Sequence, residues 1–155
     1  MKNICSEDKY PDLLEATSNY LEFIEELSDI ESLYYTISGD PTKKIDTIMN
    51  RTLKITKLYP HFFSPWFILA NSYAIKEDYP KAIEAYEKAL KYDSNQANYA
   101  RMYNNLLVVY LSQKMYKKTI ELIKSLDIGI KTFPHISDII RRVEELTGEH
   151  LLGEN

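Results

Sequence analysis

The chain has few of the residues that form tight turns or covalent cross-links. Of its 155 residues, only four are glycine, six are proline and one is cysteine, Cys5. So few turn-forming residues argue against an all-β fold, which needs a turn after each short strand. A single cysteine excludes a disulfide within the chain, and we interpret Cys5 as a bystander near the N-terminus and not as a nucleophile. The composition therefore favours helices and a reducing compartment.

Long apolar runs are also lacking. The longest, Leu106–Leu111, has six residues, whereas a membrane-spanning helix needs about 20. The N-terminal residues MKNICSEDKY do not contain the apolar stretch of a signal peptide. These absences predict a cytoplasmic protein with no membrane span.

Reactive side chains do not cluster at any spacing typical of a catalytic or metal site. His61, His135 and His150 stand far from one another and from Cys5 in the sequence, so no metal is expected. There is no glycine-rich phosphate loop, and the adjacent acidic pairs at 25–26 and 144–145 would diverge on a helix. The sequence predicts no catalytic residue and no cofactor, and we expect a protein that is not an enzyme. A small helical enzyme or sensor with a ligand-sized pocket is the alternative from another class.

Acidic and basic residues are distributed unevenly. The formal net charge is −4, but residues 1–40 carry ten acidic residues and two lysines, whereas the remaining 115 residues carry a net charge of +4. The acidic segment is either an arm that docks on the rest of the protein or a solvated helix face. Lysines and glutamates alternate between 81 and 124 without a stripe of arginine and aromatic residues, so no nucleic-acid partner is expected.

Helical periodicity extends over nearly the whole chain. Apolar residues recur at steps of three and four from 11 to 37 and again from 45 to 55. The Gly39–Pro41 cluster and Pro60 end these segments, and Ser28–x–x–Glu31 resembles a capping box that would divide the first into two helices. We expect an all-α fold of six or seven antiparallel helices.

A helical hairpin is the clearest pattern, and it lies between Ser64 and Asn95. Its first helix carries Trp66, Leu69, Ala70 and Tyr73 on one face, and its second carries Tyr79, Ala82, Ile83, Tyr86, Ala89 and Leu90. The small alanines allow the two backbones to approach closely. The same pattern returns 37 residues later, at Tyr103, Leu106, Tyr110, Tyr116, Ile120 and Ile123. A unit that repeats in this way predicts a stack of hairpins.

Trp66-x-x-Leu69-Ala70-x-x-Tyr73 followed by Ala82-x-x-x-Tyr86-x-x-Ala89 resembles a tetratricopeptide repeat. The family's period is about 34 residues, so the three additional residues around 96–100 are expected to lengthen the next helix. The sequence departs from the family where Ala70 and Leu107 replace glycine and Ser94 replaces proline. Thr119 and Leu126 replace both small residues of the second hairpin, whose helices should therefore lie further apart.

This resemblance implies a single all-α domain, 1–155, in which hairpins stack into a short superhelix. We divide it into N-terminal helices at 11–60, one repeat at 63–96, a second at 100–133 and a capping helix at 134–148.

The resemblance also implies a concave groove, lined by the first helix of each hairpin, that binds a peptide or helix of another protein. The expected partner-binding residues are Phe67, Ile68, Asn71, Arg101, Asn104, Asn105, Val108, Arg141 and Arg142. Phe67 and Ile68 form either an apolar recognition patch or a contact with the preceding helix, and the asparagines either hold a peptide backbone or are exposed polar residues. We expect a non-enzymatic adaptor or assembly subunit of a multiprotein complex.

A second implication comes from members of the family that act as co-chaperones. These grip an acidic C-terminal tail with a clamp of Lys, Asn, Asn, Lys and Arg. Asn71 and Asn105 match the asparagines and Arg142 the arginine, but Phe67 and Asp138 stand at the lysine positions. Because two cations are missing, carboxylate capture would be weak. A co-chaperone-like module with a partial clamp is the alternative function.

Overall fold

The computed structural model describes residues 11–35, 41–92 and 96–152. In these ranges the chain forms helices and no strand, so the predicted all-α class is confirmed. The helices are α1 (Pro11–Tyr35), α2 (Pro41–Leu58), α3 (Phe63–Ile75), α4 (Tyr79–Tyr92), α5 (Gln96–Ser112), α6 (Tyr116–Ser125), α7 (Ile128–Lys131) and α8 (Pro134–Thr147). These are eight helices within the described ranges, where six or seven were predicted, because α7 adds a single turn before α8.

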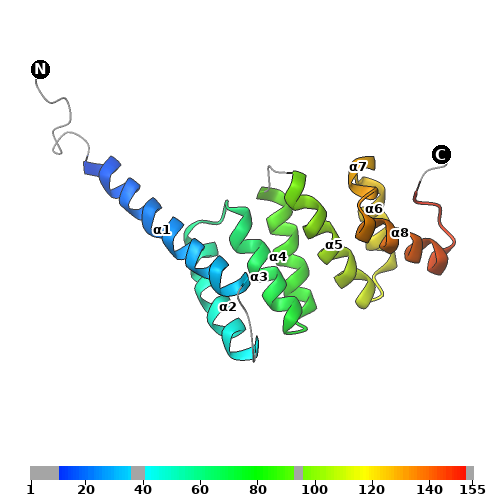
Figure 1. The fold of residues 1–155 in the computed structure, drawn as a ribbon, viewed down its shortest axis with the longest axis horizontal. Helices are drawn as coiled ribbons and strands as arrows, with labels where there is room; N and C mark the ends of the chain where they lie inside the picture. The colour runs from blue at the N-terminus through cyan, green and yellow to red at the C-terminus, as the bar shows by residue number, and fades with distance from the viewer. Residues whose placement is uncertain (1–10, 36–40, 93–95, 153–155) are drawn as a thin grey trace, which may run out of the picture.

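The helices follow one another along the longest dimension of the molecule, with α1 at one end and α8 at the other (Figure 1). Each long helix contacts its neighbours in the sequence, and α3 also contacts α1 and α5. The N-terminal half of α1 extends beyond the other helices (Figure 1). No helix in the described ranges is long and apolar enough to cross a membrane.

The predicted break in the first helical segment is wrong, because α1 is one continuous helix of 25 residues. The segment from 12 to 35 contains no glycine or proline that would interrupt it. Ser28 is exposed, while Phe23 and Ile30, two helical turns apart, are buried on one side. The apolar stripe thus runs through the position where the capping pattern indicated an end.

The α3–α4 hairpin packs as the alanine spacing predicts. Ala70, Ala82 and Ala89 are fully buried, and they belong to a core cluster shared by α3, α4 and α5. The turn after α3 places Glu77 at a positive φ of 59°, and the backbone N–H of Asp78 donates a 2.9 Å bond to the carbonyl of Tyr73. This arrangement is a common way to end a helix.

The same turn recurs 37 residues later, after α5. Lys114 has a φ of 55°, and the N–H of Met115 donates a 2.9 Å bond to the carbonyl of Tyr110. Helix α5 has 17 residues against 13 in α3, which confirms the predicted extension. Thr119, which replaces a small residue of the second hairpin, is fully buried, as Ala82 is at the equivalent position of the first.

Three clusters of buried apolar side chains run through the molecule and share α3 and α5. One joins α1, α2 and α3, a second joins α3, α4 and α5, and a third joins α5, α6 and α8. Helix α3 is therefore buried on most of its circumference, including the six consecutive residues from 67 to 72. The rigid positions of α3 and α5 determine the geometry of the surface between them.

Candidate functional site

Two hollows lie along α5 and share Asn104 and Asn105. The first, of about 420 Å³, is lined by Tyr34, Asn71, Ala74, Ile75, Tyr86, Asn104, Asn105, Val108 and Val109. The second, of about 410 Å³, is lined by Ala100, Arg101, Asn104, Asn105, Phe133, His135 and Ile136. Because the two hollows share a wall, we treat them as one groove, which extends from α1 across α3 and α5 to the start of α8.

Large apolar side chains are exposed in this groove. Ile75 and Val108 each leave 51% of their surface exposed, and Phe133 leaves 49% exposed. Ile75 is the last residue of α3, Val108 lies within α5, and Phe133 is the residue before α8. Apolar surface that several elements bring together around a hollow is typical of binding sites.

A buried hydrogen-bond network forms the wall between α3 and α5. Oδ1 of Asn71 accepts a 2.6 Å bond from the Tyr86 hydroxyl and a 2.8 Å bond from Nδ2 of Asn105. Asn104 donates a 3.3 Å bond to Oδ1 of Asn105. Burial raises the pKa of the Tyr86 phenol well above its usual range, so this hydroxyl is a hydrogen-bond donor at all physiological pH values. The network fixes the side-chain orientation of Asn104 and Asn105.

The predicted site residues on α3 are largely buried. Phe67 is 6% exposed and stacks on Phe63 with ring centroids 5.4 Å apart, and Ile68 is 1% exposed within the cluster of α1, α2 and α3. Ile68 thus packs against the preceding helices, as one of the two alternatives stated, whereas Phe67 packs in the cluster of α3, α4 and α5. Asn71 is 6% exposed but lines the groove. Phe67 and Ile68 thus offer almost no surface to a partner.

The predicted residues on α5 lie together in the groove. Asn104 and Asn105 are half-buried, Val108 is exposed in the first hollow, and Arg101 is exposed at the second. Arg141 and Arg142 on α8 line neither hollow. Each instead pairs with an acidic residue of its own helix, Arg141 with Asp138 at 3.1 Å and Arg142 with Glu145 at 3.3 Å. The structure therefore brings five of the nine predicted residues, these four and Asn71, into one surface.

Two of the five clamp positions lack a cation in the structure. Phe67 is in the core, and Asp138 places a carboxylate where a cation is needed. A carboxylate ligand would meet few positive groups here.

Sequence reasoning missed groove residues at the ends of the two predicted repeats and outside them. Tyr34 was assigned to the packing stripe of the first segment, and Phe133 and His135 flank a proline that was interpreted only as the start of a capping helix. Ile75 is the last residue of α3, and its position off the packing face of Trp66, Leu69, Ala70 and Tyr73 already indicated an exposed side chain. The alternation of α1, α3, α5 and α8 along the groove is what brings these distant residues together.

The groove has the chemistry of a recognition surface. Its lining combines aliphatic, aromatic and amide side chains with one arginine and one histidine. Within residues 11–35, 41–92 and 96–152, no three histidine, cysteine or acidic side chains are grouped so as to hold a metal ion. Such a surface binds by apolar contact and by hydrogen bonds from amides.

Comparison with known proteins supports the interpretation of the first hairpin. The family model of the tetratricopeptide repeat matches residues 64–96, which cover α3 and α4 almost completely. No curated protein matches the sequence at a significant level. The repeat is a module for protein–protein interaction in general. The chain therefore contains a tetratricopeptide repeat at residues 64–96, as the spacing of Trp66, Ala82 and Ala89 indicates.

Proposed function

We propose that the protein is a non-catalytic adaptor or assembly subunit that binds a helix or short peptide of another protein in the groove. The observation that carries the proposal is the joining of two hollows by Asn104 and Asn105, with the exposed side chains of Ile75, Val108 and Phe133 around them. The apolar side chains would contribute most of the affinity by burial.

The chemistry of the groove defines the class of ligand. Apolar side chains of the ligand, one or two helical turns apart, would enter the two hollows. The amides of Asn104 and Asn105, oriented by Asn71, would bond polar groups of the ligand between those contacts. Arg101, exposed at the second hollow, favours an acidic residue near that end.

The proposal is tested by crosslinking and by substitution. A photoreactive residue at Val108 should capture the partner, whereas the same residue at Lys117, which is exposed on α6, should not. Val108→Glu and Ile75→Glu should each weaken binding by about tenfold or more, because each places a charge where an apolar contact is expected. Lys117→Glu is the matched control for added negative charge. Unchanged affinity in both groove variants would exclude this surface as the site.

The salt dependence separates the two functions considered. A partner held by Ile75, Val108 and Phe133 should remain bound at high salt, because apolar contacts are not screened. A partner held through a carboxylate by Arg142 should dissociate as salt is added and should be lost in Arg142→Ala. The second result would favour the co-chaperone-like alternative.

A further inference from the structure

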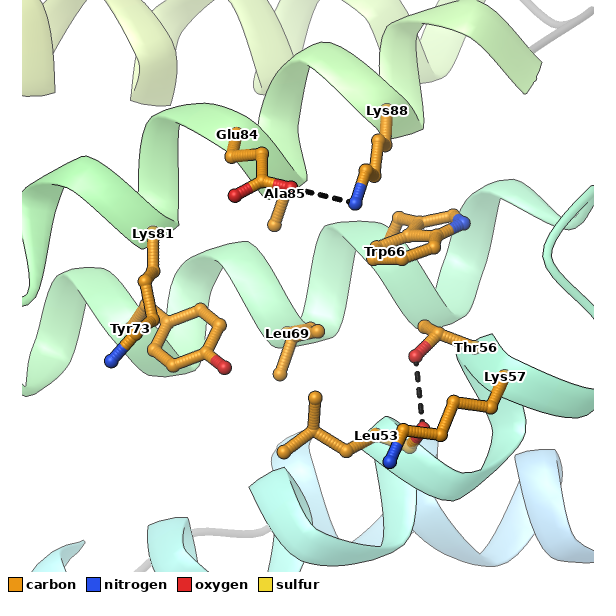
Figure 2. A pocket seen from close by; sticks show the side chains of 10 residues that line it. All are labelled: Leu53, Thr56, Lys57, Trp66, Leu69, Tyr73, Lys81, Glu84, Ala85 and Lys88. Atoms are coloured by element: carbon orange, nitrogen blue, oxygen red, sulfur yellow. Dashed lines mark hydrogen bonds and ion pairs between the residues drawn. The ribbon is translucent and has the colours of Figure 1, made fainter.

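A third hollow lies outside the groove and shares no residue with it. It is enclosed by α2, α3 and α4 and has a volume of about 200 Å³. Figure 2 shows Leu53, Leu69 and Ala85 at its centre, with the rings of Trp66 and Tyr73 on either side of Leu69. We call this the aromatic pocket. It has the size and lining to accept an aliphatic side chain such as leucine or isoleucine.

Positive charge surrounds the aromatic pocket. Lys57, Lys81 and Lys88 line it with one carboxylate, Glu84, while Asp78 next to it pairs with Lys81 at 2.5 Å, so the net charge at the pocket is positive by one lysine, Lys57. The ammonium of Lys88 lies 4.6 Å from the centre of the Trp66 ring and 2.7 Å from Glu84, and that of Lys81 lies 5.5 Å from the centre of the Tyr73 ring. The ion pairs to Asp78 and Glu84, together with attraction to the ring faces, hold these two cations beside the apolar centre. The pocket thus fits an apolar side chain flanked by carboxylates.

Helix α1 carries that combination on its outer side. Between residues 15 and 34 it has six acidic residues and no basic one. Leu21 is 57% exposed and Ile24 is 40% exposed, and Glu25 follows Leu21 by four residues, so the three side chains share one face. Within the described ranges, Glu25 has no basic partner, unlike Glu26, whose carboxylate makes two 2.7 Å bonds to Arg51.

The outer face of α1 cannot reach the aromatic pocket of its own molecule. Phe23 and Ile30 fix the opposite side of α1 against α2 and α3, and the Tyr59 hydroxyl donates a 3.0 Å bond to the carbonyl of Asn19. The N-terminal half of the helix extends away from the other helices, where another molecule has access to it (Figure 1).

We propose that α1 of one copy docks into the aromatic pocket of a second copy. Leu21 or Ile24 enters between Trp66 and Tyr73, and Glu25 pairs with lysines of the rim, of which Lys57 has no ion pair within the described ranges. The charge distribution supports a second copy as the occupant, because the first 40 residues carry a net charge of −8 and the rest of the chain +4. This inference is independent of the proposed groove function.

The experiment is sedimentation equilibrium of the full chain over a wide range of concentration, at low and at high salt. We expect reversible association, either as a reciprocal dimer or as longer assemblies, that weakens as salt screens the charge pairs. Leu21→Ser and Lys57→Glu should each weaken association by about tenfold or more. Ile128→Ser, which alters a still more exposed apolar residue on α7, and Lys117→Glu on α6 are the matched controls and should associate like the parent.

Charge reversal provides the test of the specific pair. Glu25→Lys and Lys57→Glu should each associate weakly alone, and a mixture of the two should associate more strongly than either, because the reversed charges again face each other. A chain that remains monomeric at every concentration overturns the proposal and leaves the pocket to an acidic segment of another protein. Association that Leu21→Ser and Lys57→Glu leave unchanged also overturns it.

Discussion

Asn105 on α5 donates a 2.8 Å hydrogen bond to Oδ1 of Asn71 on α3, and the same oxygen accepts a 2.6 Å bond from the hydroxyl of Tyr86 on α4. One buried carbonyl oxygen thus connects the hairpin to the first helix of the next unit. A buried hydroxyl that loses its acceptor carries a desolvation penalty. The network is therefore expected to contribute to stability as well as to the shape of the groove.

Replacing the shared acceptor should destabilise the fold. Asn71→Leu should lower the free energy of unfolding by about 1–3 kcal/mol, because the Tyr86 hydroxyl stays buried without its partner. Denaturant unfolding measures the loss. Asn104→Leu, which removes only a 3.3 Å bond at the surface of the groove, is the control and should cost less.

In the double variant Asn71→Leu/Tyr86→Phe, the total loss should be smaller than the sum of the two single losses, because neither polar group remains. Additive losses would contradict the shared bond.

The two equivalent turns should respond alike to glycine. Glu77 and Lys114 have φ values of 59° and 55°, a region that costs most residues about 1–2 kcal/mol and glycine almost nothing. After the greater entropy of glycine in the unfolded chain is subtracted, Glu77→Gly and Lys114→Gly should each raise stability by about 0.5–1 kcal/mol. Thermal unfolding measures both. Lys76→Gly, at a negative φ of −84°, should instead be destabilising. A loss of stability in both turn variants would show that the turns do not have this geometry.

The hairpin was predictable because its signals are local. Ala82 and Ala89 recur at helical spacing, and a position that must be small to allow close packing is visible in the sequence alone. The extension of α5 was predictable for a similar reason, since extra residues inside a repeat must be added to one of its helices. Local periodicity thus predicts both the helices and their pairing.

The groove was less predictable because burial depends on three neighbours at once. Phe67 and Asn71 lie off the packing stripe of the hairpin, yet α1 and α5 cover α3 from other sides. A polar residue such as Asn71 tolerates this burial only because Tyr86 and Asn105 satisfy it, and that match appears only when three helices are placed together. The continuity of α1 through Ser28 was missed because a capping pattern also occurs inside helices.

Enlarging the alanines of the first hairpin should separate α3 from α4. Ala82→Leu and Ala89→Leu should each cost about 1–3 kcal/mol, because both side chains are fully buried against α3. Thr119→Leu on α6, at the equivalent and also fully buried position, should cost less because it adds less volume than a change from alanine to leucine. Lys91→Leu, at an exposed position of α4, is the control for the added apolar surface. Equal losses of melting temperature at the equivalent positions 82 and 119 would mean that the two hairpins pack alike.

The C-terminal segment is held to α8 by one carboxylate. Oε1 of Glu144 accepts a 2.5 Å bond from the backbone N–H of Leu151 and a 2.9 Å bond from that of Leu152. These two bonds are the main reason that the pKa of Glu144 lies below its usual value of 4.5. They position Leu151, which is 5% exposed, in the cluster formed by α5, α6 and α8.

This contact should make the docking of Leu151 dependent on pH. Because the pKa of Glu144 is lower in the folded protein than in the unfolded chain, its contribution is complete above 4.5 and is lost as the pH falls through the folded value. Amide hydrogen exchange at Leu151 and Leu152 measures it. We expect strong protection at neutral pH that decreases in acid, and weaker protection in Glu144→Gln at neutral pH, because a neutral amide is a poorer acceptor than a carboxylate. The difference between parent and variant should shrink below pH 4.5.

Glu145→Gln is the matched control, since that carboxylate pairs with Arg142 and accepts no backbone bond within residues 96–152. Equal protection in Glu144→Gln and the parent at neutral pH would show that the carboxylate does not hold the segment.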